Sequence, residues 1–328
     1  MADPALRAPD ETGVTAWFVR NPVAANLLMI LIIVLGALTA VGALLYAVVD
    51  EDLKRVLAYS TVENVGIIYV ALGLALAFKA TGLDAAAAVS MTAALLHVIF
   101  HSWYKMLLFL GAGAVLHSTG RRDFSGLGGL IHRMPRTALL FLVGALAISA
   151  LPPLNGFVSE WLLFQAVLAG PGFPEPVLRF LIPAVGGLLA LAAALAAACF
   201  VRVYGIIFLG RPRSGEAAAA HEVPLAQWGA MALLAGLCIA GGLFAAPLID
   251  ILKPLTTALV GAALPGSGTG PTPSVPGSFP PCPGSTTTRR LLLGRLSVML
   301  CQRAVRTTNR IHRHSVRAAR PTMMLRFR

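Results

Sequence analysis

Three ionisable residues spaced four apart mark the part of the sequence where chemistry is most readily expected. His97, His101 and Lys105 lie in an apolar stretch, from about Ala85 to Leu116, that has no other formal charge. In a helix, residues four apart lie about 40° apart around the axis, so the three side chains share one face over ~12 Å. Ionisable groups inside a membrane span cost roughly 3 kcal/mol or more each and usually mark a proton or ion path. The spacing therefore predicts such a path; the alternative is that these groups only bond neighbouring helices or extend to the lipid surface.

A second candidate site lies beside an expected interruption of a helix. In the segment ALPPLNGFVSE, Pro152, Pro153 and Gly156 interrupt an apolar run, and Glu160 lies shortly after them. Proline removes a backbone N–H and clashes with the preceding turn, and each half of the run, about 13 residues, is too short to cross a bilayer. Helices broken inside a membrane are typical of transporters. We predict one discontinuous spanning helix with Glu160 near its break; the alternative is two short helices joined by a surface loop.

The composition indicates which elements must position these residues. Of the 328 residues, 57% are hydrophobic and 12% are charged, and long apolar runs recur along the chain. Because a spanning helix needs about 20 apolar residues, this pattern excludes an ordinary water-soluble protein. It predicts an all-α fold, a polytopic transmembrane helical bundle of about six spans. The expected spans are residues 23–49, 56–78, 86–116, 137–168, 178–209 and 226–249.

The positive charges between the expected spans predict the orientation of the bundle. The loops after the first, third and fifth spans carry eight Lys and Arg residues, and the loops after the second, fourth and sixth carry three. Loops rich in Lys and Arg stay in the cytoplasm, so the first set is expected there. Arg7 and Arg20, which precede the first span, would then lie outside, in conflict with the same rule.

The two ends of the chain differ in composition from its central part. Residues 1–264 carry 15 Lys and Arg against 14 Asp and Glu, whereas residues 265–328 carry 11 Arg and no acidic residue. Residues 1–16 are polar and are expected to be disordered. Of the 24 residues in 265–288, 21 are Pro, Gly, Ser or Thr, which is the composition of a linker. Residues 289–328 are expected to form an Arg-rich, disordered tail.

The Arg-rich tail has two interpretations. One is binding to anionic lipid or to nucleic acid. The other, which we favour, is that the tail is not selected sequence, because 11 Arg without any Lys, Asp or Glu is typical of GC-rich DNA translated out of frame. We therefore expect no nucleic-acid partner.

Three motifs in the central part together resemble one family of membrane proteins. They are DLKRVLAYSTVENVGI, LLHVIFHSWYKMLLFLGAGAVLH and ALPPLNGFVSEWLLFQA, and they lie between about Gly42 and Pro254. In order and spacing they resemble the antiporter-like proton-pumping membrane subunits of respiratory complex I and of hydrogenases, most closely hydrogenase-4 component B and the membrane subunit of formate hydrogenlyase. The resemblance implies an antiporter-like proton-translocation domain at residues 42–264. This domain is partial, because the family's unit has two inverted repeats and the first has no counterpart here.

The resemblance also implies roles for individual residues, because a line of buried Lys, His and Glu residues carries protons in that family. In this sequence the path comprises the lysine of a D-[LI]-K-R motif, two histidines, the lysine four residues on and the acidic residue after the broken helix: Lys54, His97, His101, Lys105 and Glu160. Glu63 is a possible accessory residue. Pro152, Pro153 and Gly156 form the helix break.

The implied function is proton translocation by a membrane subunit of a hydrogenase-4 or NADH-quinone oxidoreductase (complex I)-like assembly in the bacterial cytoplasmic (inner) membrane. Its expected partners are the other membrane subunits and the lipid bilayer. Two alternatives stay open: a subunit of a multi-subunit cation/proton antiporter, and a truncated or fused membrane protein that transports nothing. We find no haem or iron–sulfur ligand pattern, no Gly-rich nucleotide loop and no nucleophile elbow. Redox chemistry would therefore belong to the assembly, and we expect no cofactor or metal on this chain.

The first span resembles a different family. The stretch TAWFVRNPVAANLLMILIIVLGALTAV resembles the first transmembrane helix of resistance-nodulation-division efflux transporters. An efflux transporter would follow this helix with a large extramembrane domain, whereas here another helix follows. We therefore assign residues 17–41 as an efflux-transporter-like first helix that precedes the antiporter-like domain.

Overall fold

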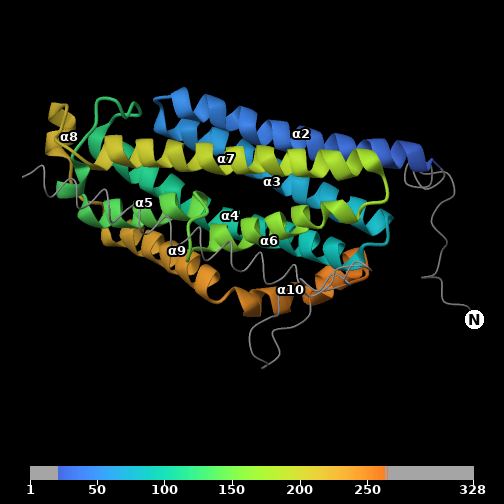
Figure 1. Ribbon diagram of the computed structural model, residues 1–328. Helices are drawn as coiled ribbons and strands as arrows, with labels where there is room; N and C mark the ends of the chain where they lie inside the picture. Colours follow the sequence, from blue (N-terminus) through green and yellow to red (C-terminus); the bar gives the residue numbers. More distant parts are fainter. Residues whose placement is uncertain (1–20, 263, 265–328) are drawn as a thin grey trace, which may run out of the picture. The chain divides into compact units, whose positions relative to one another are not determined.

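The chain folds into helices that run side by side along a common direction (Figure 1). The computed structural model describes residues 21–262 and 264, and within these it contains no β-strand. The expected disordered N-terminus (1–16), linker (265–288) and Arg-rich tail (289–328) lie outside the described residues. The helices are α2 (Pro22–Val49), α3 (Leu53–Ala80), α4 (Asp84–Thr119), α5 (Pro135–Ile148), α6 (Asn155–Leu168), α7 (Pro176–Phe208), α8 (Gly215–Ala219), α9 (Leu225–Leu243) and α10 (Ala245–Val260), with 3-10 turns η1 (Leu130–His132) and η2 (Gly170–Gly172).

The predicted all-α membrane bundle is confirmed. Five helices, α2, α3, α4, α7 and α9, are long and apolar enough to cross a membrane. The predicted fourth span is two 14-residue helices, α5 and α6, which both pack against α4 and follow one another along the bundle (Figure 1). The chain is therefore a membrane-embedded helical protein with one spanning element in two parts.

The predicted sixth span, residues 226–249, was wrong in its extent. Helix α9 ends at Leu243 and α10 begins at Ala245, so the span is interrupted. The interruption follows two glycines, which favour helix poorly, and these glycines allow a close backbone contact. A Cβ atom added to Gly242 would lie 2.0 Å from the carbonyl oxygen of Pro153. The end of α9 thus packs directly on the break between α5 and α6.

The α5–α6 break is only partly enclosed. Pro152 and Pro153 are exposed, whereas Leu154, Asn155 and Gly156 are buried. A Cβ atom added to Gly156 would lie 2.0 Å from the carbonyl oxygen of Ala147, at the end of α5, so only glycine fits there. The first turn of α6 therefore lies inside the bundle although the two prolines face outward.

The loops after the first, third and fifth spans meet at one end of the bundle. The backbone at Asp52 forms an isolated antiparallel β-bridge with the backbone at Asp123. The Gly129 N–H donates to the Leu209 carbonyl at 2.9 Å, and Arg213 donates to the Leu127 carbonyl at 3.0 Å. We call this the Arg-rich end (residues 50–52, 119–134 and 209–224). It gathers the loops that the charge count assigned to one side of the membrane.

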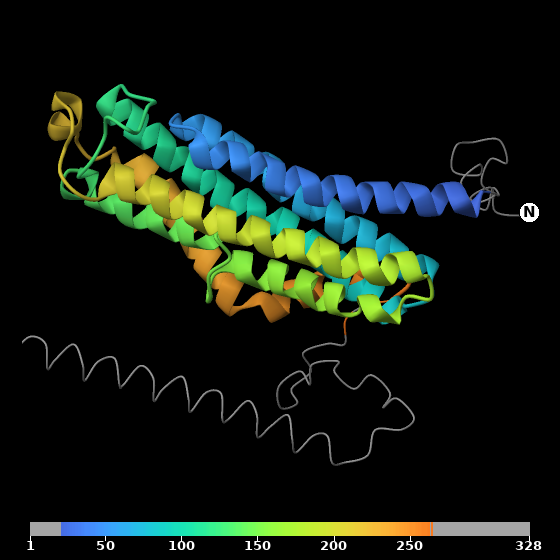
Figure 2. The same ribbon diagram turned by 45° about the horizontal axis from the view of Figure 1, so that its top comes forward.

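Arg202 fastens α2 to α7 at the Arg-rich end. Its Nη1 donates to the carbonyl oxygens of Val48 at 2.7 Å and Asp50 at 2.9 Å, and its guanidinium lies over the ring of Phe124. These carbonyls terminate α2 and would otherwise lack partners. The contact joins α7 to the end of α2, and the two helices run in nearly the same line along the bundle (Figures 1 and 2).

The opposite end of the bundle joins the remaining loops. Phe78 stacks on Phe173 with ring centroids 4.6 Å apart, and Lys79 pairs with Asp84 at 2.8 Å. Helix α2 begins at this end and runs toward the Arg-rich end (Figure 1). This is the direction that the loop charges assign, and it is opposite to that of a first helix that starts in the cytoplasm.

Helix α2 packs against α3 through paired glycines. A Cβ atom at Gly36 would lie 2.7 Å from the Gly66 carbonyl oxygen, and one at Gly66 would lie 2.5 Å from the Gly36 carbonyl oxygen. Small residues at such crossings let helix backbones approach closely in membranes. Because Gly36 belongs to the efflux-like stretch, that stretch fits against α3, and α2 continues unbroken past residue 41.

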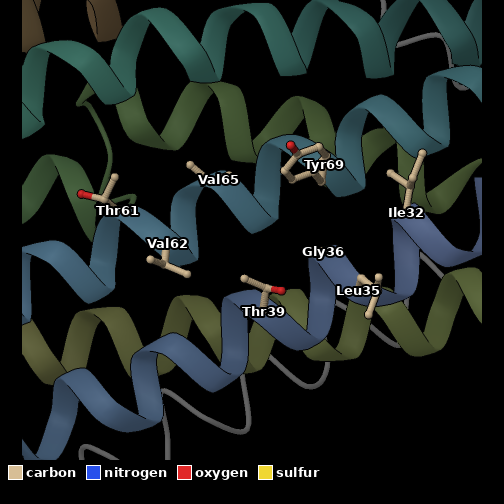
Figure 3. A pocket seen from close by; sticks show the side chains of 8 residues that line it. All are labelled: Ile32, Leu35, Gly36, Thr39, Thr61, Val62, Val65 and Tyr69. Carbon is tan, nitrogen blue, oxygen red and sulfur yellow. The ribbon is translucent and has the colours of Figure 1, made fainter.

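An apolar hollow of about 350 Å³ opens beside the glycine contact. Figure 3 shows its lining, to which α2 contributes Leu35 and Thr39 and α3 contributes Thr61, Val65 and Tyr69. Of the residues that the structure describes, no lysine, histidine or carboxylate lines it. The ionisable residues predicted from the sequence therefore lie outside this hollow.

Candidate functional site

His97 lies at the meeting point of three helices. It is 2% exposed, and its position on α4 places its ring between α3 and α6. The Nε2 atom is 3.0 Å from Oδ1 of Asn64, and the Nδ1 atom is 3.0 Å from Oγ of Ser159. The histidine therefore connects α3 to the first turns of α6, just after the helix break.

Asn64 is the centre of the hydrogen-bond network on the α3 side. Its Oδ1 accepts from the Tyr104 hydroxyl at 2.6 Å, and its Nδ2 donates to the Ser60 carbonyl at 2.7 Å and to the Glu63 carboxylate. Asn64, Tyr104 and Glu63 are all buried. Every polar atom of the Asn64 amide is thereby bonded, as a buried amide requires.

Lys105 lies two helical turns from His97 and faces the same helix. Its Nζ donates to the Leu57 carbonyl and to the Ser60 hydroxyl, both at 2.6 Å, and lies 5.9 Å from the centre of the Phe109 ring. The side chain is buried, with 5% exposed. Ser60 joins the two halves of the network, because its hydroxyl accepts from Lys105 and its carbonyl accepts from Asn64.

These contacts form one connected set that we call the buried polar line. Its members share burial among apolar side chains and come from α3, α4 and α6: Ser60, Glu63, Asn64, His97, Tyr104, Lys105 and Ser159. Charged groups in such surroundings are costly unless they are paired or bonded. A line of this kind therefore indicates a function rather than a contribution to stability.

One glutamate, Glu63, belongs to the line, and a second, Glu160, lies within electrostatic range of it. Glu63 is 1% exposed and interacts with both Lys105 and Glu160. Glu160 is half-buried and follows Ser159 directly on α6. The structure thus gathers Lys105, Glu63, His97 and Glu160 around the contact of α3, α4 and α6, although they come from distant parts of the chain.

His101 differs from His97 and Lys105, which share its helix face. Its side chain is half-buried, and its ring meets Tyr104 edge-on with centroids 5.7 Å apart. Its Nε2 atom is buried and, among the described residues, has no hydrogen-bond partner. Lys105 lies close enough to interact with it electrostatically. The shared face predicted from the sequence thus carries His97 and Lys105 toward α3, with His101 between them and less enclosed.

Lys54 is not brought into the buried polar line. It is exposed on the first turn of α3, where its backbone N–H donates to the carboxylate of Asp52 at 2.8 Å. Asp52 also accepts from the Arg55 N–H and thereby caps the helix. The expectation that Lys54 flanks a buried line of groups does not match this position, because in this turn of α3 Leu53 and Val56 face the core and Lys54 lies on the exposed side.

The network contains residues that the sequence reasoning missed. Ser60, Asn64, Tyr104 and Ser159 carry no charge, so they did not stand out within apolar helices. A partial signal was present, because Ser60 and Asn64 are four residues apart and hence share a face of α3. Ser159 precedes Glu160 in sequence, but its role depends on the packing of α6 against α4, which the sequence does not show.

The Arg-rich end has a different electrostatic character. There Arg121 lies 3.6 Å from Asp123 and 3.7 Å from Glu216, all on the surface. Hydrogen bonds from Ser125, helped by Arg121, hold the pKa of Asp123 below its ordinary value. The backbone N–H of Glu216, the Ser214 side chain and Arg121 lower the pKa of Glu216. These groups are charged at neutral pH and tie loops together.

The chemistry open to the buried polar line is proton transfer. It contains an amine, an imidazole, a phenol, two hydroxyls and a carboxylate in one bonded set, with a second carboxylate beside it. In the described part of the chain, no group of three or more His, Cys, Asp or Glu residues is placed to hold a metal ion. Histidine exchanges protons near neutral pH, and hydroxyl and amide groups can orient such exchange.

Comparison with known proteins gives a consistent result. Residues 12–173 match the family model described as NADH:quinone oxidoreductase/Mrp antiporter, transmembrane. Hydrogenase-4 component B of Escherichia coli K12 is 44% identical over 210 residues, 64% of this chain and 31% of that protein. Formate hydrogenlyase subunit 3 of the same organism is 41% identical over 224 residues, 68% of this chain and 37% of that protein.

The solved structure of an Mrp complex from Dietzia sp. DQ12-45-1b contains a chain with the same fold. The TM-score is 0.60 at 20% identity, over 71% of this chain and 47% of that chain. The family match extends from the efflux-like first helix through the α5–α6 break. The chain spans about a third of the length of the curated relatives named above.

Proposed function

Because residues 12–173 belong to the family of transmembrane NADH:quinone oxidoreductase and Mrp antiporter subunits, we propose that this chain is a proton-translocating membrane subunit of a hydrogenase-4 or complex I-like assembly. The family is one of antiporter-like membrane subunits, and the relatives named above are subunits of a hydrogenase and of a formate hydrogenlyase. The activity of the whole assembly comes to this chain only as part of the proposal.

The buried polar line is the observation that carries the proposal. It extends without a gap from Lys105 through Ser60, Asn64 and His97 to Ser159, inside a bundle whose other interior residues are mostly apolar. Its two ends differ in chemistry, with a lysine at one end and Glu160 beside the other. Such an arrangement suits proton exchange at both ends of the line, where the charge on one group alters how firmly its neighbours hold a proton.

In the proposed mechanism each step moves one proton between neighbouring groups. Lys105 releases a proton toward Glu63, which interacts with it electrostatically. His97 passes its Nδ1 proton to the Ser159 hydroxyl while that hydroxyl gives up its own proton toward Glu160. His101, half-buried beside Tyr104, is a side branch of this path. Lys54 lies at the Arg-rich surface, where it can collect or release protons but does not share the buried bonds.

The location and partners follow from the same proposal. The chain is embedded in a membrane, which we take to be the bacterial cytoplasmic (inner) membrane, with the Arg-rich end on the cytoplasmic side. Other membrane subunits of the assembly are its partners. They matter here because the chain spans only about a third of its relatives' length.

One observation favours a second candidate function. The matched family includes Mrp antiporter subunits, and the Mrp complex contains a chain with the same fold. The chain would then be a subunit of a multi-subunit cation/proton antiporter. Proton flux that depends on sodium would support this alternative, and flux that depends on the redox substrate of the assembly would support the first.

The test replaces Lys105 by methionine, which keeps an unbranched side chain one atom shorter and removes its charge. Proton uptake is measured in membrane vesicles that contain the full chain with its partner subunits. We expect uptake to fall roughly 100-fold, the scale of a lost acid–base group. The matched control is Lys79→Met, which removes an exposed lysine at the end of α3. Unchanged uptake in Lys105→Met would overturn the proposal, and would favour a subunit that transports nothing.

A further inference from the structure

Asn64 bonds in a way that determines which nitrogen of His97 carries a proton. Its Nδ2 lies against two acceptors, the Ser60 carbonyl and the Glu63 carboxylate, so the amide nitrogen must be on that side. Its Oδ1 therefore faces both Tyr104 and His97. An amide oxygen can only accept. The Nε2 atom of His97, 3.0 Å away, must therefore donate, which requires a proton on Nε2.

The other nitrogen of His97 is consequently the one that changes state. With Nε2 protonated, neutral His97 has its lone pair on Nδ1, 3.0 Å from the Ser159 hydroxyl. That hydroxyl also lies 3.1 Å from the Gly156 carbonyl, so it has two acceptors for its single proton. When His97 is neutral, Ser159 donates to Nδ1. When His97 gains a proton, Nδ1–H donates to Ser159, and the hydroxyl turns to Gly156.

We propose that Asn64 is a positioning residue that makes proton exchange at His97 one-sided: the proton is gained and lost at Nδ1, toward Ser159 on α6, and not at Nε2, toward α3. This inference rests on the proposed function, because one-sided exchange matters only if His97 carries protons. The turn of the Ser159 hydroxyl links that exchange to Gly156, the glycine packed against the end of α5 at the helix break.

The titratable groups around His97 leave this assignment unchanged. Glu63 faces the network from α3, His101 and Tyr104 from α4, and Glu160 from α6, and none of them is bonded to a ring nitrogen of His97. The proton on Nε2 is thus fixed by Asn64, whose Oδ1 also holds the Tyr104 hydroxyl. Both nitrogens of His97 have one partner each, so the ring has no competing orientation that keeps both bonds.

The tautomer of His97 can be measured without any transport assay. The full chain, labelled with [15N]histidine and reconstituted in lipid nanodiscs, gives separate ring signals for protonated and unprotonated nitrogens, and His97→Gln identifies those of His97 among the seven histidines. We expect neutral His97 to be protonated at Nε2. In Asn64→Leu we expect this preference to fall about tenfold, as one lost hydrogen bond allows. Gln227→Leu, which removes another amide bonded to α4, should leave it unchanged.

A second measurement connects the tautomer to proton movement in vesicles with the partner subunits. We expect Asn64→Leu and Ser159→Ala to slow proton uptake about tenfold or more, because each removes one of the two bonds that direct the exchange. Ser90→Ala removes a buried hydroxyl that bonds α4 to α3 and should not slow it.

If neutral His97 is protonated at Nδ1, the inference is wrong. It is also wrong if Asn64→Leu removes the preference for a proton on Nε2 and proton uptake stays normal. These results are distinct from normal uptake in Lys105→Met, which overturns the proposed function and leaves the tautomer assignment standing.

Discussion

The Arg-rich end and the interior of the bundle contain the same kinds of charged residue in opposite surroundings. At the Arg-rich end, Arg121, Asp123 and Glu216 are exposed, and the ion pair of Arg121 with Glu216, at 3.7 Å, joins two loops. In the interior, Lys105 and Glu63 are buried and bonded to backbone carbonyls, hydroxyls and an amide. Exposed pairs contribute little and are screened by salt, whereas buried charges are costly. Only the interior charges therefore need a functional explanation.

The largest expected effect comes from removing the interior carboxylate. Glu63→Gln keeps the shape of the side chain but removes a carboxylate that can accept a proton from Lys105. We expect proton uptake in vesicles with the partner subunits to fall roughly 100-fold, with little change in the amount of folded chain. Glu216→Gln makes the same change at the Arg-rich end and should leave uptake within twofold of the unaltered chain, roughly the effect of a weak surface pair. Equal effects of the two variants would erase the distinction between the regions.

Much of this interior could be predicted from the sequence, for a physical reason. The spacing of His97, His101 and Lys105 fixes a shared helix face because a helix has 3.6 residues per turn, and an apolar run that long has to be a span. The helix break at Pro152 and Pro153 could be predicted because proline lacks the backbone N–H that continues the hydrogen bonds of a helix. Both predictions depend on local backbone geometry, which the sequence determines directly.

The features that could not be predicted from the sequence depend on packing between distant segments. Asn64 and Ser159 became site residues only because α4 lies between α3 and α6 and brings His97 to both. Lys54 was expected in a buried line because of its motif, but the Asp52 cap places it at the exposed start of α3. The division of the last span depends on Gly242, which meets a carbonyl from another helix. No local pattern encodes these contacts.

The next effect is on stability and tests the boundary between the two regions. Arg202 lies at the Arg-rich end but bonds to the carbonyls that end α2. Arg202→Met should lower the free energy of unfolding by about 2 kcal/mol, because two carbonyls lose a charged donor. The measurement is a denaturant titration in mixed micelles. Arg121→Met, which removes only exposed pairs, should lower it by less than about 0.5 kcal/mol. A loss of the same size in both would show that burial of the partners does not matter here.

A smaller effect is expected at the start of α5. The Glu222 carboxylate accepts from the backbone N–H groups of Arg136 at 2.9 Å and Thr137 at 3.4 Å, and from the Thr137 hydroxyl. A carboxylate at this position satisfies free N–H groups and favours the positive end of the helix. Glu222→Ala should lower the free energy of unfolding by about 1 kcal/mol in the same titration, without slowing proton uptake. Slower uptake would mean that α5 transmits changes from the Arg-rich end to the interior.

The smallest effect concerns the pH response of the Arg-rich end. The pKa values of Asp123 and Glu216 are lowered on folding, so their stabilising contribution is present above the unfolded values, 3.8 and 4.5, and is lost as pH falls through the folded values. A spin label at Ala218, an exposed residue of α8 near Glu216, should therefore report unchanged mobility from pH 8 down to about pH 5 and greater mobility only below about pH 4. Asp123→Asn should give part of that mobility already at pH 7, and added salt should do the same. Mobility that rises between pH 7 and pH 5 would contradict this, because neither carboxylate changes charge there. It would mean that a group outside these ion pairs ties the loops, and that the two regions are less separate than their burial indicates.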